Sequence, residues 1–291
     1  MQRFHSTGWV ACICALSAVV VVEARAAEFE LQCASDDKFL QIYSDHEVEP
    51  ARCKSIAERV LKTYAFIGKL AAWKNQDILR ANPLQFRLLG GNLKVLGYAQ
   101  GPNLMVMKDD YLDKPLSEGT LAHELTHIQD LRQLKGKRLP SFMLEGRALT
   151  IGKTYRMFLG QGPNSYDQQM AGSALRFSSA QVEQLLNEYR GKGWNNQAIG
   201  TVLVEYMRTK WNGSGVPDIN VRLSRMIEIM AAGAEFEPAF EKEFGVPAAA
   251  VGEAFMKHLD ATQGDPRARL QGTIWQSTSP SDSTEDEEDD D

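Results

Sequence analysis

L-A-H-E-L-T-H-I-Q-D, residues 121–130, places two histidines four positions apart, with a glutamate directly after the first. On a helix, residues four apart lie on one face with their Cβ atoms about 5–6 Å apart, so His123 and His127 can reach one ion. Glu124 is rotated by about 100° from His123 and therefore lies beside such an ion rather than on it. An apolar stripe on the same helix predicts burial against a core: Leu121, Leu125, Ile128 and Leu131.

A catalytic zinc site takes three protein ligands and keeps its fourth position open, so the two histidines need a partner. Glu145 stands out because it is a carboxylate inside the apolar run L-P-S-F-M-L-E-G-R-A-L, 18 residues beyond His127. A helix that ends near Gly136 and an antiparallel helix from Ser141 would return Glu145 to the level of His127. The alternative is that Glu145 is an ordinary surface residue of the second helix.

These two segments resemble the gluzincin group of zinc metallopeptidases, the thermolysin-like, peptidase MA-like superfamily. In that group, H-E-x-x-H on one helix is followed by a metal-binding Glu on the next helix. The segment P-S-F-M-L-E-G-R-A is similar to the group's pattern of an aromatic residue, here Phe142, three positions before E-G-x-A. The similarity covers residues 117–260 and is strongest in its first thirty.

The resemblance implies a role for each matching residue. His123, His127 and Glu145 are expected to bind Zn²⁺, and Glu124 is expected to act as general base and later as proton donor. The strand Asn103–Met107 matches the place where such peptidases pair an extended substrate with the edge of their sheet. The alternative for this strand is a position inside the core.

Other polar residues have no motif that fixes a role. Asp130, three residues after His127, either holds the outer nitrogen of a ligand imidazole or is an exposed helix residue. Four further residues are expected to pack or to lie at the surface and receive no role: Tyr155, Tyr206, His46 and His258.

The pattern along the chain predicts an α+β fold: a small antiparallel sheet packed on helices (zincin-like), followed by a mostly helical C-terminal region. A strand is expected at 38–44, a helix from Pro50 to Trp73, and three short strands between Leu84 and Met107. Helices are then expected near 118–134, 141–158, 180–190, 196–211, 218–232, 236–244 and 247–260. A single metallopeptidase domain would span 27–260, with an α+β part at 27–116 and a helical part with the active site at 117–260.

The first 26 residues are typical of a signal peptide. An apolar run from Val10 to Val22, broken only by Ser17, precedes an A-x-A pattern at Ala24–Ala26. About 20 apolar residues are needed to span a bilayer, so an uncleaved anchor is the less favoured alternative. We therefore expect an exported protein, periplasmic if the source is a Gram-negative bacterium and otherwise secreted, with no stable membrane insertion after cleavage.

Two cysteines, Cys33 and Cys53, remain after that cleavage. In an oxidising compartment they predict one disulfide, which would stabilise the fold by about 3 kcal/mol in the chain-entropy model. Two buried free thiols are the alternative.

The acidic charge of the chain is concentrated at its end. Residues 281–291 carry eight acidic and no basic groups, and without them the formal net charge of −6 becomes +2. A body without a dense basic cluster excludes nucleic acid and an anionic membrane surface as predicted partners. Residues 261–291 are expected to form a disordered acidic tail.

The sequence thus predicts an exported zinc metallopeptidase that hydrolyses peptide bonds with a zinc-activated water and Glu124 as general base. Its partner would be a peptide or protein substrate. One alternative is a non-catalytic envelope binding or assembly factor that retains the zincin scaffold. Another is a zinc hydrolase that acts on a non-peptide amide.

Overall fold

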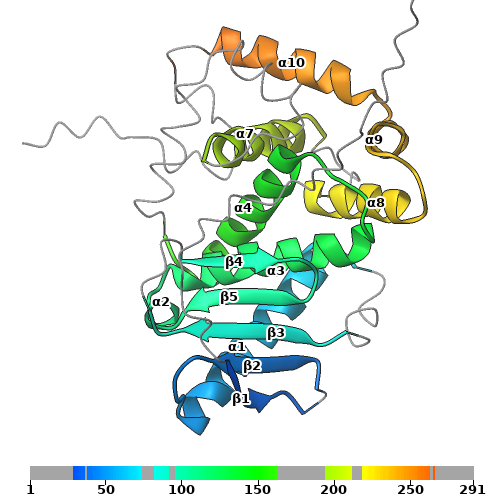
Figure 1. Ribbon diagram of the computed structural model, residues 1–291. Coiled ribbons are helices and arrows are strands. Elements are labelled where there is room, and N and C mark those ends of the chain that lie inside the picture. The colour runs from blue at the N-terminus through cyan, green and yellow to red at the C-terminus, as the bar shows by residue number, and fades with distance from the viewer. Residues whose placement is uncertain are drawn as a thin grey trace, which may run out of the picture.

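The computed structural model describes residues 29–36, 38–73, 82–91, 96–162, 194–211, 218–262 and 265. These residues form a five-stranded sheet with helices against one face and a helical C-terminal region, which confirms the predicted α+β class (Figure 1). Three predictions lie outside the described residues: the signal peptide, the helix at 180–190 and nearly all of the acidic tail.

The sheet is mixed, so the prediction of an antiparallel sheet is wrong. Strand order is β1-β2-β3-β5-β4; β2 and β5 run parallel to β3, whereas β1–β2 and β4–β5 are antiparallel. Parallel neighbours require a crossover connection, and the helix α1 between β2 and β3 supplies it. The strands are β1 (Glu30–Ala34), β2 (Leu40–Ser44), β3 (Leu84–Leu89), β4 (Gly97–Gln100) and β5 (Leu104–Lys108).

Helix α1 (Pro50–Leu70) packs beside the sheet and begins with a proline, which suits a first helical turn. Cys53 in its first turn is bonded to Cys33 of β1, with a Cα–Cα distance of 6.3 Å that is ordinary for a disulfide. The predicted disulfide is therefore confirmed, and it ties the edge of the sheet to the helix.

The short helix α2 (Asp109–Leu112) leads into α3 (Ser117–Leu134) and then α4 (Ser141–Phe158). Between α3 and α4 the chain turns at Lys135 and Gly136, both with positive φ. A left-handed residue followed by glycine is a common way to end a helix, and it reverses the chain here. Both helices begin within one residue of the predicted positions.

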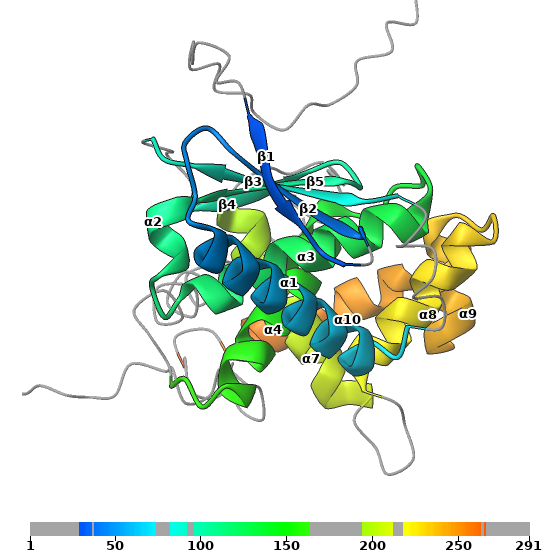
Figure 2. The ribbon, with the colours of Figure 1, turned by 90° about the horizontal axis from the view of Figure 1, so that it is seen from below.

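The described residues of the C-terminal region form four helices: α7 (Trp194–Trp211), α8 (Ile219–Ala231), α9 (Phe236–Phe244) and α10 (Ala248–Ala261). They surround one apolar core, and the sheet with α1 surrounds another. Helices α3 and α4 contribute to both cores; Figure 2 shows α1 and α3 on the same face of the sheet. Among the described residues, no helix combines the length and apolar character needed to cross a bilayer.

Candidate metal centre

His123 and His127 lie side by side on α3, one turn apart. Their Nε2 atoms are 3.0 Å apart, and the two rings meet edge to face with their centroids 4.5 Å apart. Only 11% and 14% of the two side chains is exposed. The helical spacing has therefore brought two imidazole nitrogens to one partly enclosed point, as the sequence predicted.

Glu145 of α4 reaches the same point. Its Oε2 lies 3.5 Å from Nε2 of His123 and 3.6 Å from Nε2 of His127. The two helices can approach this closely because their backbones touch: a Cβ added to Gly152 would lie 2.6 Å from the carbonyl oxygen of Gly119. Glu145 is therefore not the ordinary surface residue that the sequence left as the alternative.

The three donor atoms fit a zinc ion. Two ligands that each lie about 2.0–2.1 Å from a tetrahedral zinc are separated by about 3.3 Å, and the observed separations of 3.0, 3.5 and 3.6 Å bracket this value. Two imidazole nitrogens and one carboxylate oxygen are also a donor set that zinc favours. Glu124 lies near both histidines as well, but its Oε1 is farther from His123 Nε2, at 3.9 Å. Of the two glutamates, Glu145 is therefore the candidate for the third ligand position.

The electrostatics of the cluster favour a cation. Burial lowers the pKa of His127, but the charge and hydrogen bond of Glu145 outweigh it and raise the pKa to about 9. Burial likewise raises the pKa of Glu145, yet the two imidazoles hold it well below its usual range. The centre thus stabilises positive charge among its three donors, which is what a divalent ion would supply in place of a proton.

Glu124 lies beside the three donors and is also buried, with 7% exposed. Its Oε2 accepts a hydrogen bond of 2.8 Å from the backbone N–H of Ala99 on β4. The opposite carboxylate oxygen, Oε1, faces His123. A sheet strand therefore fixes the orientation of this carboxylate, and one oxygen stays on the side of the donor atoms.

The sheet has two edge strands, β1 and β4, and β4 is the one that contacts α3. The prediction that Asn103–Met107 forms this edge is wrong, because β5 (Leu104–Lys108) lies between β3 and β4 and is paired on both sides. The chain passes the position next to β3, forms β4 at the edge, and then turns back through β5. Pairing order of this kind depends on contacts distant in sequence, which the local pattern did not contain.

Asp130 and Arg147 form an ion pair that the sequence analysis missed. Nη1 of Arg147 donates to Oδ1 of Asp130, and neither side chain has any exposed surface. The interpretation of Asp130 as an exposed helix residue is therefore wrong. The available signal was the spacing: Asp130 is three residues after His127, and Arg147 is two residues after Glu145 within an apolar run.

Helix α7 also contacts Glu145. Nε2 of Gln197 donates to Oε2 of Glu145 at 3.2 Å. This contact depends on a close backbone crossing, because a Cβ on Gly146 would lie 2.1 Å from the carbonyl oxygen of Gly200. The glycine of the E-G-R-A segment is therefore required by the contact between α4 and α7, which the sequence pattern alone did not explain.

The four residues without an assigned role lie away from the centre. The hydroxyl of Tyr155 accepts a hydrogen bond from Thr63 in the core beside α1. Tyr206 packs against Phe255 and His258 in the C-terminal region. His46 belongs to a separate surface cluster. None of the four contributes a donor atom to the centre.

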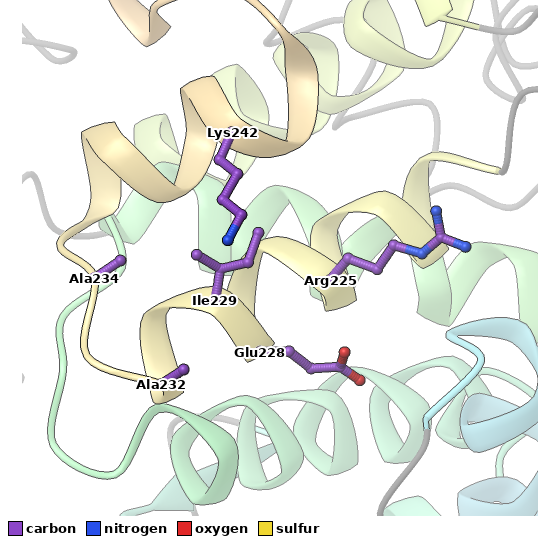
Figure 3. Close-up of a pocket in the computed structure, with 6 residues that line it drawn as sticks. All are labelled: Arg225, Glu228, Ile229, Ala232, Ala234 and Lys242. Atoms are coloured by element: carbon purple, nitrogen blue, oxygen red, sulfur yellow. The ribbon is translucent and has the colours of Figure 1, made fainter.

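A surface hollow of about 470 Å³ lies between α8 and α9 (Figure 3). It contains none of the residues of the candidate centre; the residues that line it are Arg225, Glu228, Ile229, Ala232, Ala234 and Lys242.

Comparison of the sequence with models of known protein families and with curated proteins finds no match.

Proposed function

We propose that this protein is an exported zinc metallopeptidase of the gluzincin type. The observation that carries the proposal is the convergence of Nε2 of His123, Nε2 of His127 and Oε2 of Glu145, with Glu124 oriented beside them. A purely structural zinc site fills its fourth position with a further ligand and has no use for such a glutamate. Three donors and a separate buried carboxylate are the arrangement that a hydrolase needs.

The two histidines and Glu145 would hold the ion. When bound, zinc supplies Lewis acidity, which lowers the pKa of a water molecule and polarises a carbonyl group. Glu124 accepts the proton of the attacking water and later delivers it to the leaving nitrogen. The Ala99 N–H keeps Oε2 of Glu124 occupied, so Oε1 is the oxygen that transfers the proton.

The outer edge of β4, which pairs with no further strand among the described residues, is the proposed place for an extended substrate. The carbonyl of Leu96 accepts a hydrogen bond from the backbone N–H of Lys108, so the carbonyl of Leu96 faces β5. The N–H and C=O of one residue point to the same side of a strand, and the side alternates from residue to residue. Those of Gly97 and Ala99 therefore face away from β5, and the Ala99 N–H meets Glu124. Because the Ala99 N–H already donates to Glu124, an added strand would pair with the other outward groups, those of Gly97 and the carbonyl of Ala99, and bring a peptide bond beside Glu124.

Export is part of the proposal. The apolar run from Val10 to Val22 lies outside the described residues, so the signal peptide stays a prediction. The Cys33–Cys53 disulfide supports it, because disulfides persist in oxidising compartments outside the cytosol.

Replacing Glu124 with Gln tests the reaction. We expect the variant to retain zinc but to hydrolyse peptides about 10²–10⁴-fold more slowly, because it cannot accept the proton. Glu243→Gln, a change of another partly buried glutamate, is the matched control and should leave the rate unchanged. The assay is a chelator-sensitive digest of a mixed peptide library by the metal-loaded protein.

An unchanged rate in Glu124→Gln would overturn the mechanism. Zinc binding without any peptide cleavage by wild type would favour one of the two alternatives, a non-catalytic envelope binding factor or a hydrolase of non-peptide amides. A panel of acyl amides in the same assay separates these two.

A further inference from the structure

The ion pair of Asp130 and Arg147 connects the two helices that carry the proposed ligands. Asp130 belongs to α3 with the two histidines, and Arg147 belongs to α4 with Glu145. Both side chains are completely buried. The pair is therefore a fixed crosslink between α3 and α4 close to the metal centre.

A third helix is joined to this crosslink. Nη2 of Arg147 donates to Oγ of Ser224 on α8 at 2.8 Å, and Oγ of Ser224 donates to the carbonyl oxygen of Asn220 at 2.9 Å. Arg147 thus donates one hydrogen bond to a residue of α3 and another to a residue of α8. This double attachment restricts the guanidinium to one position and, through it, the carboxylate of Asp130.

Stability alone does not account for a buried pair of this kind. Moving two charges out of water opposes folding, and apolar residues of similar volume in such places often give an equally stable protein. Asp130 lies about one helical turn after His127, and Arg147 lies two residues after Glu145. The pair can therefore also fix where the proposed ligands stand.

We propose that Asp130 and Arg147 are positioning residues of the metal centre, which set the register of α3 against α4 and so the distance between the two histidines and Glu145. The inference rests on the proposed zinc binding. Asp130 lies three residues after His127, so the two side chains share one face of α3. Arg147, held by Asp130 and Ser224, fixes the turn of α4 from which Glu145 extends.

Asp130 makes no hydrogen bond to the imidazole of His127 among the described residues. Within the described part of the chain, Oδ2 of Asp130 accepts no hydrogen bond, while Oδ1 is engaged by Arg147. The effect of Asp130 on the ligands therefore passes through the packing of α3 against α4, which the ion pair fixes, and not through a bond to the ring.

The test replaces the pair without leaving a buried charge. In Asp130→Leu/Arg147→Met both charges are removed together, and the matched control Glu243→Leu/Arg222→Met removes the part-buried ion pair between α8 and α9. For each protein we would measure the melting temperature of the metal-free form and the zinc dissociation constant by competition with a chromophoric chelator. The visible spectrum of the Co²⁺-substituted protein reports ligand geometry independently.

We expect the Asp130→Leu/Arg147→Met protein to fold but to bind zinc about 10- to 100-fold more weakly, with an altered Co²⁺ spectrum. The control should bind zinc as wild type does. Should the double variant fail to fold, Asp130→Asn keeps an oxygen for Arg147, removes the charge, and is expected to weaken zinc binding in the same direction.

Zinc affinity within about threefold of wild type in the folded variants would overturn the inference while leaving the zinc site intact. Failure of wild type itself to bind zinc would instead overturn the proposed function, and the two failures are therefore distinguishable.

Discussion

Two clusters of histidine and carboxylate in this protein differ in how their donor atoms are directed. At the surface, Nδ1 of His46 lies 2.7 Å from Asp45 and Nε2 lies 2.9 Å from Asp109, so each ring nitrogen has its own carboxylate. In the buried cluster, two imidazole nitrogens and one carboxylate oxygen face a single point. The surface set is satisfied by hydrogen bonds within itself, whereas the buried set has its donors directed at a place for a cation. The direction of the donor atoms, and not the residue types, separates a candidate metal centre from an ordinary ionic cluster.

The largest difference should appear in the free energy of unfolding when the arginine beside each cluster is removed: Arg147 at the buried cluster and Arg52 at the surface cluster. Arg147→Met leaves Asp130 buried without a partner, and we expect a loss of about 3–5 kcal/mol in the free energy of unfolding. Arg52→Met removes the partner of Asp109 and Asp113 at the surface, where 33% of the Arg52 side chain is exposed, and should cost about 0–1 kcal/mol. Urea denaturation of the metal-free proteins measures both. Equal losses would remove the distinction between the two sites.

Metal affinity should separate the clusters next. Glu145→Gln removes a charged donor from the convergent set. Residues that only support a ligand change metal affinity by about 10–100-fold, so we expect the loss of this donor to weaken zinc binding by about 100-fold or more. Asp109→Asn alters the surface cluster and should leave the zinc dissociation constant unchanged. Competition with a chromophoric chelator provides the measurement. A comparable loss in Asp109→Asn would mean that zinc does not bind at the buried cluster.

Metal removal offers a related comparison. A ligand that binds only the folded state at 100 times its dissociation constant stabilises that state by about 2.7 kcal/mol. Zinc should therefore raise the melting temperature of wild type and of His46→Asn by the same amount, and chelation should reverse the shift. His127→Asn should show almost no shift. Calorimetry with and without zinc would contradict the account if His46→Asn lost the stabilisation and His127→Asn kept it.

The smallest effect is expected from pH at the surface cluster. The hydrogen bond with Asp45, together with Asp109, raises the pKa of His46 despite its partial burial. Stability from a raised pKa is fully present below the unfolded value of about 6.5 and is lost as the pH rises through the folded value. His46→Asn should therefore be about 0.5–1 kcal/mol less stable than wild type at pH 5.5, and the difference should shrink at pH 9. A difference that grows with pH in urea denaturation would refute this assignment.

The sequence predicted the parts of this centre that depend on local geometry. Helical spacing brought His123 and His127 together, and the turn at Gly136 with an antiparallel return placed Glu145 beside them. Two predictions, the antiparallel sheet and the edge position of Asn103–Met107, were wrong because segments far apart in the chain decide which strands pair with β3. The sequence left Asp130 open between a partner of a ligand imidazole and an exposed helix residue, because α8, whose Ser224 binds Arg147, begins 89 residues after it.

Zinc content and X-ray absorption of the purified wild-type protein test the central claim most directly. After reconstitution and dialysis, the account predicts one zinc per chain, with two imidazole nitrogens and a carboxylate oxygen at about 2.0–2.1 Å. His46→Asn should give the same spectrum. No retained zinc, or a retained zinc with fewer than two imidazole ligands, would contradict the claim that His123, His127 and Glu145 form a metal centre.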